Sequence, residues 1–225
     1  MRIALIGNRD LENGEHNDDV VKYYQVCYQL AKMGVTMTSG LAAKGCDAIA
    51  QRAYGKAIAL KEGKANIDSL EVYVAQQKNI DKSNLPYKEY SIIMPSDQEA
   101  TNKRREILKS VLDYNHYQAL TMLKNNYALG MHERNVHQIL GKDLQSPIDL
   151  VLTWCKPGHS GTKTSLLVAE KYDIPIINMY DNDNAIEELE LFLKNYFNKD
   201  ITLSKFVEES LKTSVLQPPK NNLHL

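Results

Sequence analysis

The sequence predicts an α/β fold in which a doubly wound, mostly parallel sheet is flanked by helices. Six short runs rich in β-branched and apolar residues are separated, in most cases, by stretches with helical periodicity. This alternation is typical of parallel sheets, because each strand needs a crossover connection, usually a helix, to reach a parallel neighbour. At 225 residues the chain is long enough to bury the core of one such domain.

The predicted strands span residues 3–6, 35–38, 70–74, 90–94, 148–154 and 175–179. The first helix is expected to begin near Asn17, because Asn caps helix N-termini and the following Asp18 and Asp19 suit a first turn. Gly34 is expected to end it. Further helices are expected over 47–60, after residue 160, over 184–196 and over 203–211. The polar segments 61–69 and 75–90 are expected to be surface loops.

The interval 97–142 predicts two or three helices without an intervening strand. Such a block commonly forms an excursion over the crevice of an α/β domain. We therefore expect one domain over residues 1–202 that includes this excursion. A terminal helix and tail are expected over 203–225, because Pro218 and Pro219 cannot continue a helix.

Composition and charge exclude several classes of protein. The 27 Lys and Arg residues against 28 Asp and Glu give a formal net charge of −1, so the chain has no general attraction to nucleic acid. The basic run Lys103–Lys109 leaves a local DNA contact open, with a solvated helix face as the alternative. The six histidines lack metal-ligand spacing, and the three cysteines fit a reducing compartment. No apolar stretch approaches the ~20 residues of a membrane helix. We expect a cytoplasmic protein with no metal, no cofactor and no membrane contact.

Three polar loops that contain glycine follow predicted strands. They are 7–10, 39–47 and 157–162. In an open parallel sheet, the loops at the carboxyl ends of the strands converge on one crevice, where ligands bind. A strand that leads through a loop into a helix also presents backbone N–H groups and the positive end of the helix dipole. The sequence therefore predicts one composite site for a phosphate-bearing molecule, in particular a nucleotide.

These loops, and one helix between them, resemble known motifs. Ser39–Ala48 is similar to the S-G-L-A-x-G-I-D-A signature of the DNA-processing-A (Smf) family, and Gly7–Leu11 resembles the G-S-R-D opening of the wider Smf and lonely-guy (SLOG) superfamily. Met131–Asn135 resembles the M-H-x-R-K motif of lonely-guy phosphoribohydrolases, and Pro157–Thr162 resembles their P-G-G-x-G-T loop.

Over residues 3–180 the overall pattern resembles DNA-processing-A-like proteins of bacteriophages. The matching residues are His132, Arg134, Asn135, Gln138, Leu140, Gly141, Asp143, Pro147, Asp149, Trp154, Gly161 and Thr162. The resemblance implies a Rossmann-like nucleotide-binding domain and, for a phage-encoded protein, a location in the host cytoplasm.

The chain departs from the lonely-guy pattern at one position. Those enzymes carry a catalytic glutamate three residues after the loop threonine, where this chain has Ser165. Hydrolysis of an N-glycosidic bond needs a group that stabilises the positive charge on the sugar and activates water. Ser165 cannot supply a carboxylate. Arg134 and Glu133 remain as catalytic candidates if the protein is an enzyme, and otherwise Glu133 is expected to be the ion-pair partner of Arg134.

The expected ligand-binding residues come from the three loops and the motif helix. They are Gly7, Asn8, Arg9, Ser39, Gly40, Gly45, Asp47, Arg134, Pro157, Gly158, Ser160, Gly161 and Thr162. For the glycines the alternative is a tight turn that serves only chain geometry. For Asp47 it is an N-cap of the second helix. For Arg134, which lies about 200° around the helix from the apolar Val136, it is a solvated surface position.

Three functions from different classes fit these features. The first is a protein that binds a nucleotide or nucleotide-derived ligand without turnover, in phage–host conflict or nucleic-acid metabolism; the change at Ser165 favours it. The second is a nucleoside-monophosphate phosphoribohydrolase. The third is a recombination mediator that binds single-stranded DNA, against which the neutral net charge counts. The resemblance also implies a possible homo-oligomer, with 97–142 as the candidate interface.

Overall fold

The computed structural model describes residues 1–12, 17–123, 127–158 and 160–215, and it confirms the α/β fold. Within these residues, six parallel strands form one sheet in the order β4-β3-β2-β1-β5-β6. The strands are β1 (Arg2–Gly7), β2 (Thr36–Gly40), β3 (Leu70–Val74), β4 (Ile92–Ile93), β5 (Leu150–Trp154) and β6 (Ile176–Asn178). The strand order reverses between β1 and β5. Such a switch point opens a crevice at the carboxyl ends of the two strands.

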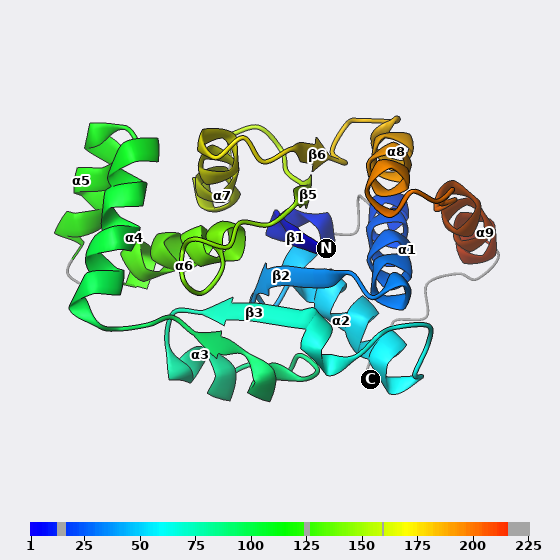
Figure 1. Ribbon diagram of the computed structural model, residues 1–225, viewed down its shortest axis with the longest axis horizontal. Coiled ribbons are helices and arrows are strands. Elements are labelled where there is room, and N and C mark those ends of the chain that lie inside the picture. The colour runs from blue at the N-terminus through cyan, green and yellow to red at the C-terminus, as the bar shows by residue number, and fades with distance from the viewer. Residues whose placement is uncertain (13–16, 124–126, 159, 216–225) are drawn as a thin grey trace.

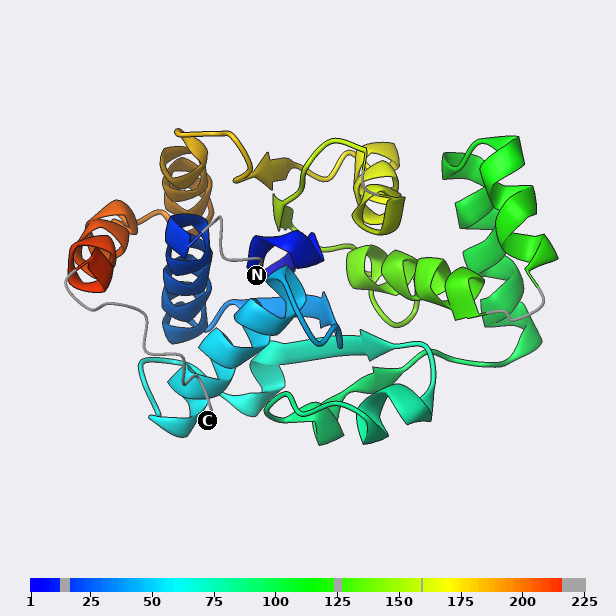
Figure 2. The same cartoon turned by 180° about the vertical axis from the view of Figure 1, so that it is seen from behind.

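Helices cover both faces of the sheet (Figure 1). On one side lie α1 (Asn17–Met33), α2 (Cys46–Ala59) and α8 (Ala185–Phe197), with α9 (Ser204–Val215) packed against α1. On the other side lie α4 (Gln98–Val111), α5 (Tyr114–Met122), α6 (Tyr127–Leu140) and α7 (Ser160–Lys171), as the reverse view also shows (Figure 2). Shorter elements are α3 (Gln77–Asp81) and the 3-10 turns η1 (Arg9–Glu12), η2 (Ile67–Ser69) and η3 (Lys88–Tyr90).

The strand side chains supply two separate apolar cores. Alternate residues of a strand point to opposite faces. Leu5 and Leu152 therefore join the core under α1, α2 and α8, whereas Ile6 and Val151 join the core under α4, α6 and α7. Burial on both faces explains why β1 and β5 are continuous apolar runs in the sequence.

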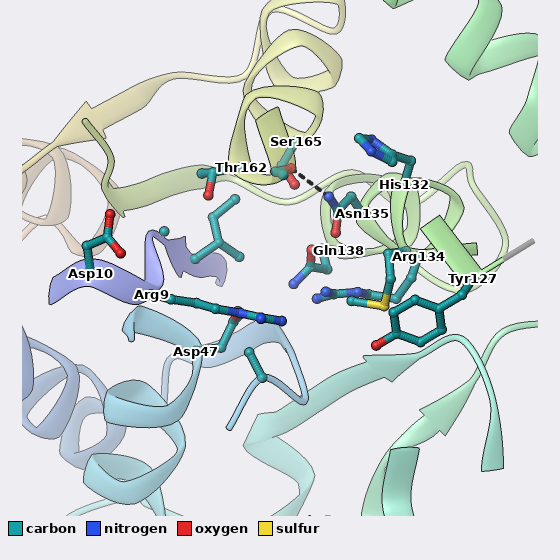
Figure 3. Close-up of a pocket in the computed structure, with 15 residues that line it drawn as sticks. Arg9, Asp10, Asp47, Tyr127, His132, Arg134, Asn135, Gln138, Thr162 and Ser165 are labelled. Atoms are coloured by element: carbon teal, nitrogen blue, oxygen red, sulfur yellow. Dashed lines mark hydrogen bonds between the residues drawn. The ribbon is translucent and has the colours of Figure 1, made fainter. Parts of the chain in front are cut away.

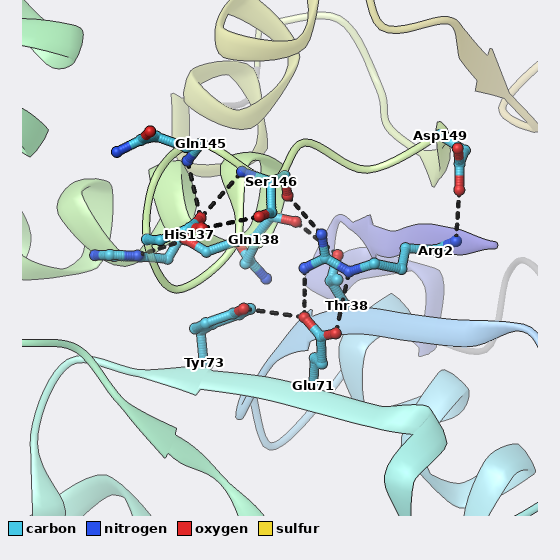
Figure 4. A network of polar contacts seen from close by, with 11 residues as sticks. Arg2, Thr38, Glu71, Tyr73, His137, Gln138, Gln145, Ser146 and Asp149 are labelled. Carbon is cyan, nitrogen blue, oxygen red and sulfur yellow. Dashed lines mark hydrogen bonds and ion pairs between the residues drawn. The ribbon is translucent and has the colours of Figure 1, made fainter.

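A polar network fixes the C-terminal end of α6 against the sheet (Figure 4). The Thr38 hydroxyl donates to the backbone carbonyl of Gln138 at 2.6 Å. The Arg2 guanidinium donates to Glu71 on β3 and to the Ser146 carbonyl, in the loop that follows α6. These bonds tie α6 to β1, β2 and β3, so the residues on its inner side are held in a set position.

The predicted strands and long helices are confirmed to within a few residues. The interval 97–142 holds three helices and no strand among its described residues. The expectation of loops over 61–69 and 75–90 was wrong in part, because η2, α3 and η3 lie there. The backbone N–H of Gln76 donates to the Asn79 side chain at 3.1 Å, and this local bond stabilises a helical turn that a polar composition does not reveal. The tail predicted from residue 217 lies outside the described residues.

Among the described residues, no helix combines the length and the apolar character needed to cross a lipid bilayer.

Candidate functional site

The structure has a hollow at the switch point between β1 and β5, which we call the first hollow (Figure 3). Its walls come from the end of β1, from η1, α2 and α6, and from the start of α7. Its volume is about 370 Å³, within the range of small-molecule sites. The polar residues that line it include Arg9, Asp10, Asp47, Arg134, Gln138 and Thr162.

A second hollow of about 380 Å³ adjoins the first on the side of β3 and α3. Arg9, Ala42, Tyr127, Met131 and Arg134 line both hollows. The second hollow adds lysines from α3 and the residue that follows it, Lys78 and Lys82. The two hollows therefore lie side by side, and Arg134 is one of the residues between them.

Arg134 is the most informative side chain of this site. It is only 6% exposed, so the alternative of a solvated surface arginine is excluded. Within the part of the chain that the structure describes, no hydrogen bond or ion pair is formed by its guanidinium. Burial lowers the pKa of Arg134, while the nearby Asp47 carboxylate opposes this shift. Buried cations are normally paired, and this one faces a hollow instead.

Gly40 and Asp47 shape the space in which Arg134 lies. A Cβ at Gly40 would lie 1.5 Å from Nη1 of Arg134, so only glycine allows this close approach. The Asp47 carboxylate accepts hydrogen bonds from the Ser39 hydroxyl at 2.8 Å and from the Gly40 N–H at 3.0 Å. Asp47 is therefore not the N-cap of α2, a position that Gly45 occupies. It fixes the end of β2 beside Arg134.

Gly7 and Gly45 have packing reasons to be glycine. A Cβ at Gly7 would lie 2.4 Å from Sγ of Cys46, and one at Gly45 would lie 2.3 Å from the Asn8 carbonyl oxygen. Gly45 also has a φ of 78°, which favours glycine. Its N–H donates to the Glu12 carboxylate at 2.6 Å. The N–H groups of Gly45 and Cys46 at the start of α2 are thus bonded within the protein, whereas Gly7 lines the first hollow.

The third loop reaches the first hollow through the first turn of α7. Gly161 and Thr162 both line the hollow, and a Cβ at Gly161 would meet no atom within 4 Å. The Gly161 carbonyl accepts a hydrogen bond from the Asn135 side chain at 2.8 Å, which joins α7 to α6. His159 and the side chain of Ser160 lie outside the described residues.

Six of the other expected ligand residues do not line a hollow. They are Asn8, Ser39, Gly40, Gly45, Pro157 and Gly158, none of which lines either hollow. Of the expected ligand residues, those that line the first hollow are Gly7, Arg9, Asp47, Arg134, Gly161 and Thr162.

Uncharged polar groups form one wall of the first hollow. Gln138 is 2% exposed, and its Nε2 has no hydrogen-bond partner among the described residues. His132 bonds to the Thr164 hydroxyl through Nδ1 at 2.6 Å. Burial, with smaller effects of His116 and Arg134, lowers the pKa of His132 to about 4, so this ring is neutral at pH 7. An unpartnered amide donor and a neutral imidazole suit the edges of a base or sugar.

Glu133 points away from the site. Its carboxylate pairs with Arg105 at 2.8 Å and with the buried Arg104 at 3.6 Å. The expectation that it pairs with Arg134 was wrong, because consecutive helix residues lie about 100° apart and face different neighbours. The buried position of Arg104 also removes it from the basic face predicted over Lys103–Lys109.

Several residues that line the two hollows were not predicted as site residues. Lys78 and Lys82 lie in the segment expected to be a loop, although their spacing of four residues is a signal for one helix face. His132, Asn135 and Gln138 belong to the motif match but were not assigned to the site. The three cysteines are free and buried, and no metal-binding group of three or more His, Cys, Asp or Glu occurs in the described ranges.

Comparisons of the chain with protein-family models, with curated proteins and with solved structures find no match.

Proposed function

We propose that the protein binds a nucleotide or a nucleotide-derived ligand at the carboxyl edge of its sheet, with Arg134 as the anchor for the ligand's phosphate. The observation that carries this proposal is the buried guanidinium of Arg134, which faces a hollow and has no hydrogen-bond or ion-pair partner among the described residues. Arginine binds phosphate through charge-assisted, often bidentate hydrogen bonds.

The neighbouring groups suit the rest of such a ligand. The first turn of α7 lies on the same hollow, and the N-terminal end of a helix favours an anion through its dipole and its backbone N–H groups. Gln138 and His132 offer uncharged polar groups for a base or ribose. Ser165, at the position of the lonely-guy glutamate, lines the hollow and brings no carboxylate there. These features favour binding without turnover, as in a protein that sequesters a nucleotide signal.

The proposal is tested by native mass spectrometry of the purified protein, followed by calorimetry with a panel of nucleotides. Arg134→Gln is expected to weaken binding strongly. Arg105→Gln is the matched control, because it removes the same charge from a side chain that pairs with Glu133 outside the hollow. Absence of binding to every nucleotide of the panel, or equal losses in both variants, contradicts the proposal.

A second candidate is hydrolysis of a nucleoside monophosphate to base and ribose 5-phosphate. It is favoured by the carboxylates of Asp10 and Asp47, which line the same hollow as Arg134. A carboxylate can stabilise the positive charge on the sugar and activate water. Chromatography of nucleotide mixtures incubated with the protein decides between the candidates. Release of free base that is lost in Asp47→Asn supports the enzyme, whereas intact nucleotides exclude it.

A further inference from the structure

The two hollows differ in charge. Arg9 and Arg134 line both of them. In the first hollow, Asp10 and Asp47 balance these two cations. The second hollow adds the cations Lys78 and Lys82, and no Asp or Glu is among its lining residues. The second hollow is therefore the more cationic of the two adjoining hollows.

The two lysines of the second hollow are placed at a cost. Lys78 belongs to α3 and Lys82 is its C-cap with a helical backbone, so at a spacing of four residues they lie on the same side, where like charges repel. The adjacent Asp81, whose carboxylate accepts a hydrogen bond from Gln77 at 3.1 Å, is not among the residues that line the hollow. Lys78 also lies over the Tyr127 ring at 5.7 Å, which directs it to a wall shared by both hollows. An anion between the lysines and Arg134 would offset this repulsion.

We infer that the second hollow holds the outer phosphates of a nucleotide with two or more linked phosphates. This inference rests on the proposed function and specifies its ligand class. The nucleoside and first phosphate lie in the first hollow, where the charges balance and Gln138 has an unpartnered donor. The phosphate chain passes Arg134 between the two hollows and ends between Lys78 and Lys82. A nucleoside monophosphate leaves the second hollow unfilled.

The test uses inorganic tripolyphosphate as the first probe, because it reports on the second hollow independently of the base. Binding is measured by calorimetry at low, fixed ionic strength, since such charge interactions are screened by salt. The variant is Lys78→Gln/Lys82→Gln. The control, Lys205→Gln/Lys212→Gln, removes the same charge from exposed lysines on α9, on the other side of the molecule (Figure 1).

The wild type and the α9 control are expected to bind tripolyphosphate alike. The α3 variant is expected to bind it about tenfold or more weakly. Equal binding by all three proteins, or no binding by the wild type, overturns the inference. The second probe is a nucleoside triphosphate compared with its monophosphate. The wild type is expected to prefer the triphosphate, and the α3 variant to lose this preference while it keeps its affinity for the monophosphate.

These outcomes separate the inference from the proposed function. If wild type binds mono- and triphosphates equally and the α3 variant does the same, the second subsite is refuted while nucleotide binding stands. If wild type binds no nucleotide at all, the proposed function itself fails.

Discussion

Replacement of Arg134 by methionine is expected to stabilise the ligand-free protein and to remove most of its anion affinity. The guanidinium is 6% exposed and has no hydrogen-bond or ion-pair partner among the described residues, so its burial is not compensated without ligand. Methionine has a similar length, lacks the charge and adapts to irregular spaces. The same side chain therefore opposes folding and favours binding.

The magnitude follows from the burial. A buried polar group left without partners costs about 1–3 kcal/mol, and a charged group costs more. Attraction to Asp47 and contact with the hollow reduce this cost, so we expect a gain of about 1–2 kcal/mol in the free energy of unfolding. For a domain of this size, that is a rise in Tm of about 2–8 °C. Loss of the charge-assisted bonds to phosphate is expected to weaken nucleotide binding about 10- to 150-fold.

Urea denaturation of the ligand-free proteins measures the first effect, and calorimetry measures the second. Arg104→Met is the matched control, since Arg104 is equally buried but donates to the Pro95 carbonyl at 2.8 Å and pairs with Glu133. Removal of one partner from a buried pair costs about 3–5 kcal/mol, so this control is expected to be destabilised. If Arg134→Met destabilises the ligand-free protein as Arg104→Met does, the reasoning is refuted.

Three further outcomes are expected. Gly161→Ala places a methyl group where no atom lies within 4 Å, so stability is kept or raised by up to about 1 kcal/mol in thermal unfolding, while calorimetry shows weaker nucleotide binding. The pKa of His132 is about 4 in the folded protein and 6.5 in its usual state, so the unfolded chain binds this proton first as the pH falls. The free energy of unfolding is therefore expected to drop by about 2–3 kcal/mol between pH 6.5 and pH 4. In His132→Asn, unfolding free energies measured by urea denaturation are expected to change less over this pH range. Glu133→Gln removes the counter-charge of the buried Arg104, and is expected to lower unfolding stability by about 3 kcal/mol without changing nucleotide affinity.

For each of these three variants, one result would contradict the expectation. Unchanged affinity in Gly161→Ala would show that the ligand does not approach the start of α7. A variant at His132 with the same pH dependence as the wild type would show that this ring is not buried neutral. Loss of binding in Glu133→Gln at full stability would place Glu133 in the site after all.

The sequence predicted the fold because its main signals are local. The apolar run that ends at Trp154 and the helix start near Asn17 are encoded by near neighbours, and β5 ends at Trp154 while α1 begins at Asn17, as expected. The direction of a polar side chain depends on distant partners. Glu133 is next to Arg134 in sequence but pairs with Arg104 and Arg105 on another helix. Lys78 and Lys82 were not predicted as site residues for a related reason, because only tertiary packing brings α3 to the crevice.

The arrangement around Arg134 indicates that its position is set before any ligand binds. Its helix is held by the Thr38 bond to the backbone at Gln138. Its guanidinium lies against Gly40, and the Gly40 N–H is fixed by Asp47. Because Arg134 is buried on a fixed helix and packs against a fixed backbone, we expect little of the binding free energy to be lost to ordering its side chain. Burial of the charge instead destabilises the folded protein whether or not a ligand is bound. For this reason a rise in unfolding free energy in Arg134→Met, together with loss of binding, tests the site more directly than a destabilising substitution does.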